Sequence, residues 1–480
     1  MIKKLNKGIF YRAELLLLLI VLFGLFLRLF FFSGMGISDS LVYGKTASDI
    51  NLGKGIDPES TLTLSTRLGL IYPTAFSYKI FGINDFSSVV FVLLTSLASI
   101  VLMFYFGKLL FNEKTGLIAA FLYSFYPLDL VYSTKLLSDL PSAFFVSLGL
   151  YLFFYLEIKK IKTWSLYIVS GILIGIGYMI RESALLIALF FIAYIIYKRK
   201  IKKKYFLVPI GVLSAVILES LLFLSLTGDI LFRFHTSQSY LQEAVIGHNY
   251  FGRLDFPLGL FHYPYLILTS NLLNSFYILI FISILYCILK KERKAYPLML
   301  WFIPLLLYLS FGSASLTSYI PFRAVDRYLS IINVAGILLI AFFLYEKRGL
   351  FKKFALHLTL SLLLISSVMS LASRNDGDLL DGLRELSPFL KQTSKPIYID
   401  DRSIKVLEYL SSFNSNIDLR VYPKNFEQIK AAYIVINKEM IKNLMEANKN
   451  RKFPEEIENP PKDWIKIKEF EDKITIYYIE

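Results

Sequence analysis

Apolar segments long enough to cross a lipid bilayer recur along the first three quarters of this chain. A transmembrane helix needs roughly 17 to 25 predominantly apolar residues, and about eleven segments meet that length. Hydrophobic residues make up 55% of the sequence, more than is usual in a soluble domain. The chain is therefore predicted to be an α-helical polytopic membrane protein. The approximate limits of the predicted spans are 13–33, 86–106, 115–133, 141–158, 164–180, 182–197, 205–226, 264–289, 295–312, 328–345 and 354–372.

Two further apolar features need a separate interpretation. The stretch 68–82 is short and contains Pro73, so we expect an interfacial helix rather than a span. The first apolar run follows Lys3 and Lys4, as in a signal peptide. That run is too long for a signal peptide and has no small-residue cleavage site, and we expect it to stay attached.

The formal net charge of +15 reflects where Lys and Arg lie relative to the spans. With the N-terminus in the cytoplasm, roughly 23 of them fall on the cytoplasmic side and roughly 10 in the outer loops, which is the positive-inside asymmetry. This predicts a multi-pass protein of the cell membrane and explains the basic charge without nucleic-acid binding. The basic segments are 3–12, 108–114, 159–162, 198–204, 290–294 and 347–353.

Several classes of chemistry have no residues to support them. The single cysteine, Cys287, lies in an apolar run, so an intrachain disulfide is impossible. The four histidines, at 235, 248, 262 and 357, have no zinc-site spacing. We find no Walker loop, dinucleotide fingerprint or serine-nucleophile elbow. The energy for any reaction must therefore come with the substrate.

The composition becomes mixed after about residue 373, which predicts two domains, 1–372 in the membrane and 373–480 outside it. The second is expected to be a small α/β domain on the extracytoplasmic face. Strands are predicted at 395–400, 418–422 and 431–436, helices at 403–413 and 438–447, and a hairpin from 464–470 to 474–479 with its turn at Glu471 and Asp472. The absence of internal repeats argues against an inverted-repeat transporter.

Asp39 follows the first span, where a carboxylate would meet the outer edge of the membrane. Partial desolvation there is expected to raise its basicity, so Asp39 is the candidate general base. Asp139 precedes Pro141 at the start of another span and is the second candidate catalytic acid. For both, capping of a helix is the alternative role.

Short motifs in order along the chain, most of them on the outer side, resemble the GT-C glycosyltransferases of the protein O-mannosyltransferase and lipid A aminoarabinose transferase type. Asp39, Tyr43, Ala47 and Gly53 match that family's acidic motif in the first outer loop, although the family often has Asp-Glu where this chain has Asp39-Ser40. The resemblance implies a GT-C fold and a polyprenyl-phosphate sugar as donor, with inversion by direct displacement. The other matching segments are 67–73, 107–111, 134–141, 227–229 with Leu231, Arg233 and His235, and 327–329.

Such a donor needs a phosphate site, for which arginine is suited because its planar guanidinium offers paired charge-assisted hydrogen bonds. Arg67, Arg181 and Arg327 are the candidate ligands. The alternatives are an internal Arg181–Glu182 ion pair or a snorkelling anchor, and interfacial anchoring of Arg327.

The remaining candidate substrate-binding residues are Tyr43, Lys135, Glu182 and Tyr328. Tyr43 has the alternative of a membrane-belt residue, and Lys135 that of neutralising Asp139. Asp139 is a candidate to orient the acceptor or to bind a divalent cation, but nothing in the sequence supports a metal, and no cofactor is implied.

We therefore expect a membrane glycosyltransferase that moves a sugar from a polyprenyl-phosphate donor to a protein, lipid or glycan acceptor outside the cell. Its partners would be membrane lipid, the lipid-linked sugar and that acceptor. A secondary transporter or lipid-linked-sugar flippase is the main alternative, since it would also have many spans and intramembrane charges. A noncatalytic assembly or polymer-export subunit is a third class, but it leaves Asp39 without a role.

Overall fold

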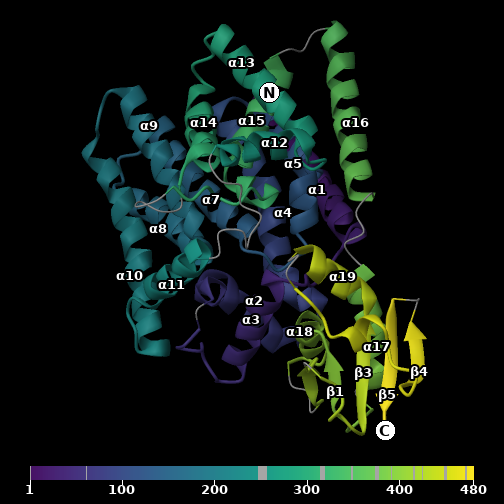
Figure 1. The fold of residues 1–480 in the computed structure, drawn as a ribbon. Helices are drawn as coiled ribbons and strands as arrows, with labels where there is room; N and C mark the ends of the chain where they lie inside the picture. Colours follow the sequence, from purple (N-terminus) through teal and green to yellow (C-terminus); the bar gives the residue numbers. More distant parts are fainter. Residues whose placement is uncertain are drawn as a thin grey trace.

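The computed structural model of this chain is a helical bundle with a small sheet domain at one end (Figure 1). It describes residues 2–60, 62–246, 257–313, 319–346, 350–372, 378–390, 392–413, 417–423, 425–447, 451–470 and 473–480. The predicted fold class is therefore confirmed. The predicted hairpin turn at Glu471 and Asp472, and His248, lie outside the described residues.

Each apolar run of the sequence is helical. Among the described residues, five helices are long and apolar enough to cross a membrane, and four shorter apolar helices accompany them. The bundle helices are α1 (Ile2–Phe30), α4 (Asp85–Leu110), α5 (Glu113–Ser124), α6 (Pro127–Tyr132), α7 (Asp139–Ile158), α8 (Ser165–Ile180), α9 (Ala188–Lys198), α10 (Leu207–Thr227), α12 (His262–Thr269), α13 (Asn274–Leu289), α14 (Tyr296–Phe311), α15 (Ser330–Glu346) and α16 (Leu350–Ala372).

Two expected spans are interrupted. The run 115–133 is divided into α5 and α6 because Pro127 cannot continue the helix and holds the preceding Tyr126 in an extended conformation. The run 264–289 is divided into α12 and α13 at Ser270, whose backbone is extended. Polar side chains next to Ser270 can hydrogen-bond to the backbone, which competes with the hydrogen bonds of a continuous helix. By contrast, α3 (Leu68–Phe81) continues through Pro73, so the predicted short helix forms without a break.

The bundle is packed around α15, in which almost every residue from Ser330 to Leu344 is buried. Close helix contacts elsewhere depend on glycine, as is typical of membrane helices. A Cβ on Gly107 of α4 would lie 2.7 Å from the Cα of Gly116 in α5. A Cβ on Gly171 of α8 would lie 2.9 Å from the Cα of Gly211 in α10. These backbones therefore touch directly.

The C-terminal domain contains a five-stranded sheet in the order β2-β1-β3-β5-β4. Strand β1 pairs in parallel with β2 and with the central β3, and β5 pairs antiparallel with β3 and β4. All five strands and two of the helices lie where the sequence predicted them. The elements are α17 (Asp378–Leu390), β1 (Ile397–Ile399), α18 (Asp401–Leu410), β2 (Leu419–Val421), β3 (Ala432–Asn437), α19 (Lys438–Ala447), α20 (Glu455–Glu458), β4 (Ile465–Phe470) and β5 (Ile474–Ile479).

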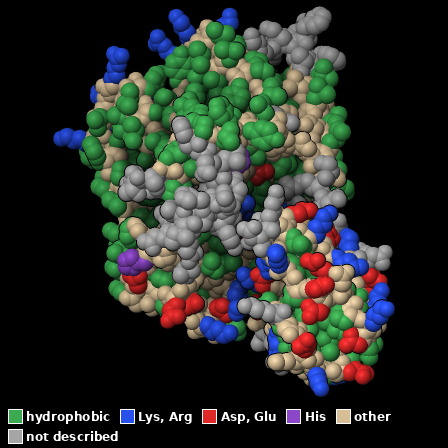
Figure 2. All heavy atoms as spheres, viewed as in Figure 1, with side chains coloured by type: hydrophobic (Ala, Val, Ile, Leu, Met, Phe, Trp, Pro, Cys, Tyr) green, Lys and Arg blue, Asp and Glu red, His purple; other side chains and the backbone are tan. Residues whose placement is uncertain are grey.

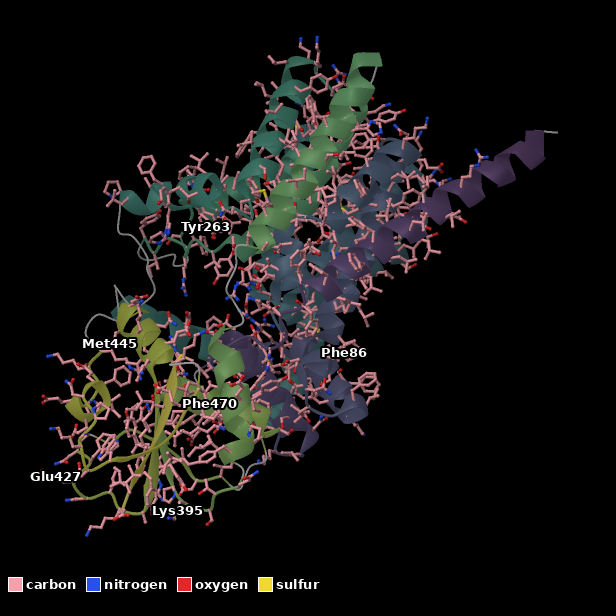
Figure 3. All side chains as sticks on the ribbon, turned by 90° about the vertical axis from the view of Figure 1, so that its right-hand side faces the viewer. Phe86, Tyr263, Lys395, Glu427, Met445 and Phe470 are labelled. Carbon is pink, nitrogen blue, oxygen red and sulfur yellow. The ribbon has the colours of Figure 1, made fainter. Side chains whose placement is uncertain are left out.

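Helix α17 was not predicted. Its signal was the helical spacing of Leu383, Leu386 and Leu390, all of which are buried. These leucines share a hydrophobic cluster with Phe470 of β4, and Figure 3 shows Phe470 beside this helix. The helix therefore covers one face of the sheet.

Short helices lie at the lower end of the bundle, the end at which the sheet domain is attached (Figure 1). They are η1 (Thr63–Thr66), α2 (Asp39–Asn51), α3 and α11 (Phe232–Ile246). Lys and Arg side chains project from the edge of the bundle farthest from the sheet domain, with hydrophobic surface below them (Figure 2). This is the distribution that the predicted orientation requires.

We predict that Glu427 lies outside the cell and Lys203 inside it. Both side chains are exposed, one in the sheet domain and one in η3 (Lys203–Phe206). In a Cys287→Ser background, an impermeant thiol reagent applied to intact cells should label Glu427→Cys but not Lys203→Cys. Lysed cells, in which both should react, provide the control. Labelling of Lys203→Cys but not of Glu427→Cys in intact cells would show that the protein has the opposite orientation.

Candidate active site

Charged residues from distant parts of the chain meet at the end of the bundle that faces the sheet domain. Asp39 and Arg327 are separated by 288 positions, yet an Arg327 Nη lies 2.6 Å from a carboxylate oxygen of Asp39. Asp39 is the first residue of α2, and Arg327 lies in η5 (Asp326–Leu329) just before α15. The fold therefore joins the predicted base to a predicted phosphate ligand.

Asp39 does not cap its helix. The N-cap of α2 is Ser38, which makes no side-chain capping hydrogen bond, and the Asp39 carboxylate is used for the ion pair instead. Partial burial raises the pKa of this carboxyl, but Arg327 and two further arginines outweigh that effect and hold the pKa below its ordinary value. The expected rise in basicity is thus wrong for this state, because the sequence did not reveal that a guanidinium would lie so close.

Asp139 is the buried acid of the site. It is the first residue of α7, after the N-cap Ser138, so it does not cap the helix either. One carboxylate oxygen lies 2.5 Å from an Arg181 Nη, and the other lies 3.7 Å from the Nε of Arg327. Neither oxygen has a well-aligned hydrogen-bond donor among the described residues. Asp139 therefore retains the capacity to accept a hydrogen bond from a hydroxyl group.

Arg67 holds the other side of the cluster. It lies between η1 and α3, is buried, and donates hydrogen bonds to Tyr43, to Ser138 Oγ at 3.0 Å and to Glu182 at 3.2 Å. Tyr43 is fully buried, which excludes a membrane-belt role, and burial raises the pKa of its hydroxyl group. Ser138 is also 3.4 Å from Arg181, so one serine links two candidate phosphate ligands.

Glu182 is not paired with Arg181, and the alternative of an internal pair between these neighbours is wrong. It accepts hydrogen bonds from Arg67 and, at 2.8 Å, from Arg233 of α11. Arg233 in turn donates to Glu219 of α10 at 2.6 Å. The backbone of Arg181 is extended, which turns successive side chains to different sides.

Tyr328 supports the arginines through its ring. The Arg181 guanidinium lies 4.4 Å from the ring centroid and that of Arg327 lies 6.0 Å from it, so the ring face stabilises both cations. Lys135 is half-buried in the loop before α7. The charge of Asp139 is balanced by Arg181 and Arg327.

The cluster contains as many carboxylates as guanidinium groups. Each of these arginines is paired with a carboxylate before a substrate binds. An incoming phosphate must therefore compete with a carboxylate for its arginine. Along the cluster the order is Glu219, Arg233, Glu182, Arg67, Ser138, Arg181, Asp139, Arg327 and Asp39.

Sequence reasoning missed Ser138 and two charged members of this cluster. Glu219 is an acid within an otherwise apolar run, and such a residue is costly unless it has a partner, which was the available signal. Arg233 was noted only as part of a motif. Within the described residues, no group of three or more acids, histidines or cysteines is placed to hold a metal ion.

A second buried pair was also missed. Arg28 of α1 and Asp129 of α6 form an ion pair with side chains 0% and 1% exposed. Arg28 also donates to Ser96 Oγ at 2.8 Å and to the carbonyl oxygen of Ser124 at 3.0 Å. Ser124 is the last residue of α5, so Arg28 satisfies a carbonyl group freed where that predicted span is interrupted.

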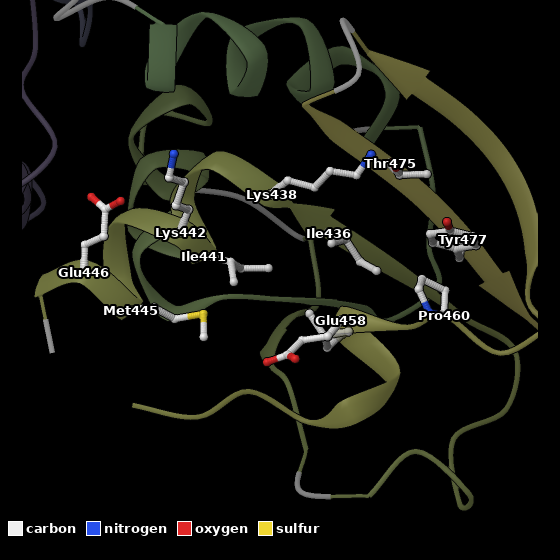
Figure 4. Close-up of a pocket in the computed structure, with 11 residues that line it drawn as sticks. Ile436, Lys438, Ile441, Lys442, Met445, Glu446, Glu458, Pro460, Thr475 and Tyr477 are labelled. Atoms are coloured by element: carbon white, nitrogen blue, oxygen red, sulfur yellow. The ribbon is translucent and has the colours of Figure 1, made fainter. Parts of the chain in front are cut away.

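A separate cavity of about 830 Å³ lies in the sheet domain between α19, α20 and strands β3 and β5 (Figure 4). Ile441 and Met445 give it an apolar wall, while Lys442 and Glu446 lie at its edge. None of its lining residues belongs to the charged cluster.

Comparisons with known proteins find one matching family model and several solved structures of similar fold. A sequence model of the dolichyl-phosphate-mannose-protein mannosyltransferase family matches residues 68–223, about a third of the chain. That segment contains Asp139, Arg181, Glu182 and Glu219. No curated protein sequence matches.

Solved structures extend the likeness to nearly the whole chain. ArnT from Cupriavidus metallidurans in the apo state has a TM-score of 0.62 at 12% identity over 98% of both chains. The same protein bound to undecaprenyl phosphate has a TM-score of 0.59 at 11% identity over 97% of both chains. The Archaeoglobus fulgidus oligosaccharyltransferase AglB, in complex with an inhibitory peptide and a dolichol-phosphate, has a TM-score of 0.58 at 14% identity over 91% of this chain and 70% of that one. The chain thus has the GT-C fold, and the predicted resemblance is confirmed.

We predict that Asp129→Ala destabilises the protein by about 3–5 kcal/mol, because it leaves the Arg28 guanidinium buried without its partner. Thermal unfolding in detergent measures the loss. Glu113→Ala is the matched control, since it breaks a partly exposed pair with Lys108 that should contribute at most about 1 kcal/mol. Equal losses in the two variants would contradict a structural role for the buried pair.

Proposed function

We propose that this protein is a membrane glycosyltransferase that moves a sugar from a polyprenyl-phosphate donor to an acceptor hydroxyl group on the extracytoplasmic face. The observation that carries the proposal is the arginine and carboxylate cluster at the end of a GT-C bundle. The undecaprenyl-phosphate complex of ArnT, which has the same fold, supports a lipid phosphate as the ligand. The acceptor is a protein, a lipid or a glycan.

In this proposal Arg67, Arg181 and Arg327 bind the donor phosphate. They converge on Ser138 and Asp139, so one phosphate group within the cluster can be reached from several sides. Arginine suits this task because two of its N–H groups can contact one phosphate. The Nε atoms of Arg67 and Arg327 are buried and have no hydrogen-bond partner among the described residues, which leaves donors for a ligand.

Binding of the phosphate also changes the pKa of Asp39. In this structure Arg327 pairs with Asp39 and lowers the pKa of its carboxyl. When the phosphate pairs with Arg327 in place of Asp39, the partly buried carboxylate of Asp39 has less positive charge near it. The pKa of Asp39 then rises, which makes the carboxylate a stronger base once the donor is bound.

The chemical step then involves the donor, the acceptor and the two carboxylates of the cluster. The acceptor oxygen attacks the anomeric carbon as the bond from that carbon to the phosphate oxygen breaks, and polyprenyl phosphate leaves. Asp39 takes the proton of the acceptor hydroxyl group. The carboxylate oxygens of Asp139, which accept no hydrogen bond from the described residues, orient that hydroxyl. The configuration at the anomeric carbon inverts.

The transporter alternative requires charges along a path through the bundle. Arg28 and Asp129 lie in the bundle, but both are fully buried and are bonded to protein groups. The cluster around Asp39, Asp139 and the arginines lies near helix ends at one side of the bundle and does not continue along such a path among the described residues. We therefore favour transfer over transport.

We predict that Asp39→Asn lowers kcat by about 10²- to 10⁴-fold with the native acceptor, because the amide keeps the shape but cannot take a proton. Donor KM should fall in Asp39→Asn, because the amide no longer competes with the phosphate for Arg327. Arg327→Ala should instead raise it because a phosphate ligand is lost. Mass spectrometry of envelope glycans, with and without the gene, identifies the sugar and acceptor for this assay.

Asp49→Asn is the matched control for Asp39→Asn. Asp49 lies on the same helix and pairs at 2.9 Å with Lys45, away from the cluster. It should leave kcat unchanged. Normal turnover of Asp39→Asn at saturating donor and acceptor would place the base elsewhere, with Asp139 the next to test. Unchanged envelope glycans after loss of the gene would contradict transfer itself.

The lowered pKa of Asp39 predicts the pH dependence. In the free enzyme its carboxylate stays ionised as the pH falls below the ordinary value of 3.8, so kcat/KM for the donor should show no acidic limb from this group above about pH 4. Arg327→Ala removes the opposing charge while burial remains, and the limb should move to higher pH. The same limb in both enzymes would show that Arg327 does not control this carboxyl.

A further inference from the structure

The Asp85 carboxylate joins the C-terminal domain to the turn that precedes α2. It pairs with Arg384 of α17 and accepts a hydrogen bond from the Tyr409 hydroxyl of α18 at 2.8 Å. The backbone N–H of Met35 donates to the same oxygen at 3.3 Å. One side chain at the start of α4 therefore binds two helices of the sheet domain and the chain segment that leads to Asp39.

This turn lies directly against Asp85. Gly34 has a φ of +72°, which glycine adopts without strain, and a Cβ there would lie 2.8 Å from the Asp85 Cγ. The turn can therefore approach the carboxylate only because residue 34 has no side chain. Met35 then precedes Asp39 by four residues, which leaves little chain to absorb a displacement.

Apolar packing reinforces the same connection. Leu41 and Tyr43 of α2 belong to one hydrophobic cluster with Val406 and Leu407 of α18 and with α17. Figure 1 shows α18 beside α2, on the side of the sheet domain that faces the bundle. Helix α2 thus packs against both the bundle and the C-terminal domain.

We propose that Asp85 is a positioning residue for the transfer reaction: by clamping the C-terminal domain to the turn before α2, it holds Asp39 beside Arg327. The inference rests on the proposed function. The C-terminal domain then contributes to the rate of the chemical step as well as to folding. A displacement of about 1 Å in a reacting group can reduce a rate by about 10²-fold, so a clamp of this kind affects turnover strongly.

The contact itself is tested without any substrate. Hydrogen exchange of the backbone amides of residues 35–43 should be faster in Asp85→Ala than in the unaltered protein, while Asp49→Ala should leave exchange in this segment unchanged. Tyr409→Phe, which removes one hydroxyl group and little else, should give a smaller increase. Unchanged exchange in both Asp85→Ala and Tyr409→Phe would overturn the proposal.

The functional arm uses undecaprenyl phosphate as the binding probe and the native acceptor for turnover. Asp85→Ala should bind the probe within about twofold of normal, because the arginine ligands do not contact Asp85, and should lose at least about tenfold in kcat. Arg384→Ala should cause part of that loss, and the double variant should lose little more than Asp85→Ala alone. Probe binding and kcat that fall in parallel would indicate general disorder and overturn the positioning role.

The two proposals fail in different ways. If the unaltered protein transfers no sugar, the proposed function fails, and hydrogen exchange still decides whether Asp85 fixes α2. If the unaltered protein transfers sugar and Asp85→Ala does so at the same rate, the positioning proposal fails and the transferase remains.

Discussion

The Arg327 guanidinium lies between two carboxylates from different helices, and the arrangement of the site depends on it. It contacts Asp39 at 2.6 Å and approaches Asp139 at 3.7 Å. A cation placed between two acids cancels their repulsion and allows them to be held near each other beside an apolar boundary. The same cation lowers the pKa of Asp39. The ion pair that holds Asp39 thus also keeps the proposed base weak until a ligand replaces Asp39 beside Arg327.

Much of the fold follows from local patterns in the sequence. The apolar runs, the alternation in the C-terminal strands and the amphipathic α19 each have a period that is visible in a short window. The breaks after α5 and α12 were missed because average hydrophobicity is insensitive to single residues, although Pro127 was a signal for the first. Helix α17 was missed although Leu383, Leu386 and Leu390 have helical spacing.

The candidate site was predictable in its members but not in its pairings. Asp39, Asp139, Arg181 and Arg327 were singled out near span ends and Arg67 in a segment that resembles the family, and the fold brings them together. Which arginine meets which acid depends on how helices pack across 288 positions of sequence, and no local pattern contains that information. The predicted direction of the Asp39 pKa shift was wrong because the sequence did not reveal that Arg327 lies beside this carboxylate. Glu219 and Asp129 are isolated acids in apolar runs, and each is paired with a buried arginine.

The glycine contact between α8 and α10 has a consequence for how such a sequence can diverge. At Gly171 and Gly211 the two backbones touch, so any side chain at either position would force the helices apart. Leu213 and Ile217 on the same α10 helix face outward and are more than half exposed, where many apolar side chains would serve equally well. Neutral drift should therefore be fast on the lipid-facing side of α10 and nearly halted a few residues away. Low overall identity between relatives is compatible with a strictly retained helix pair.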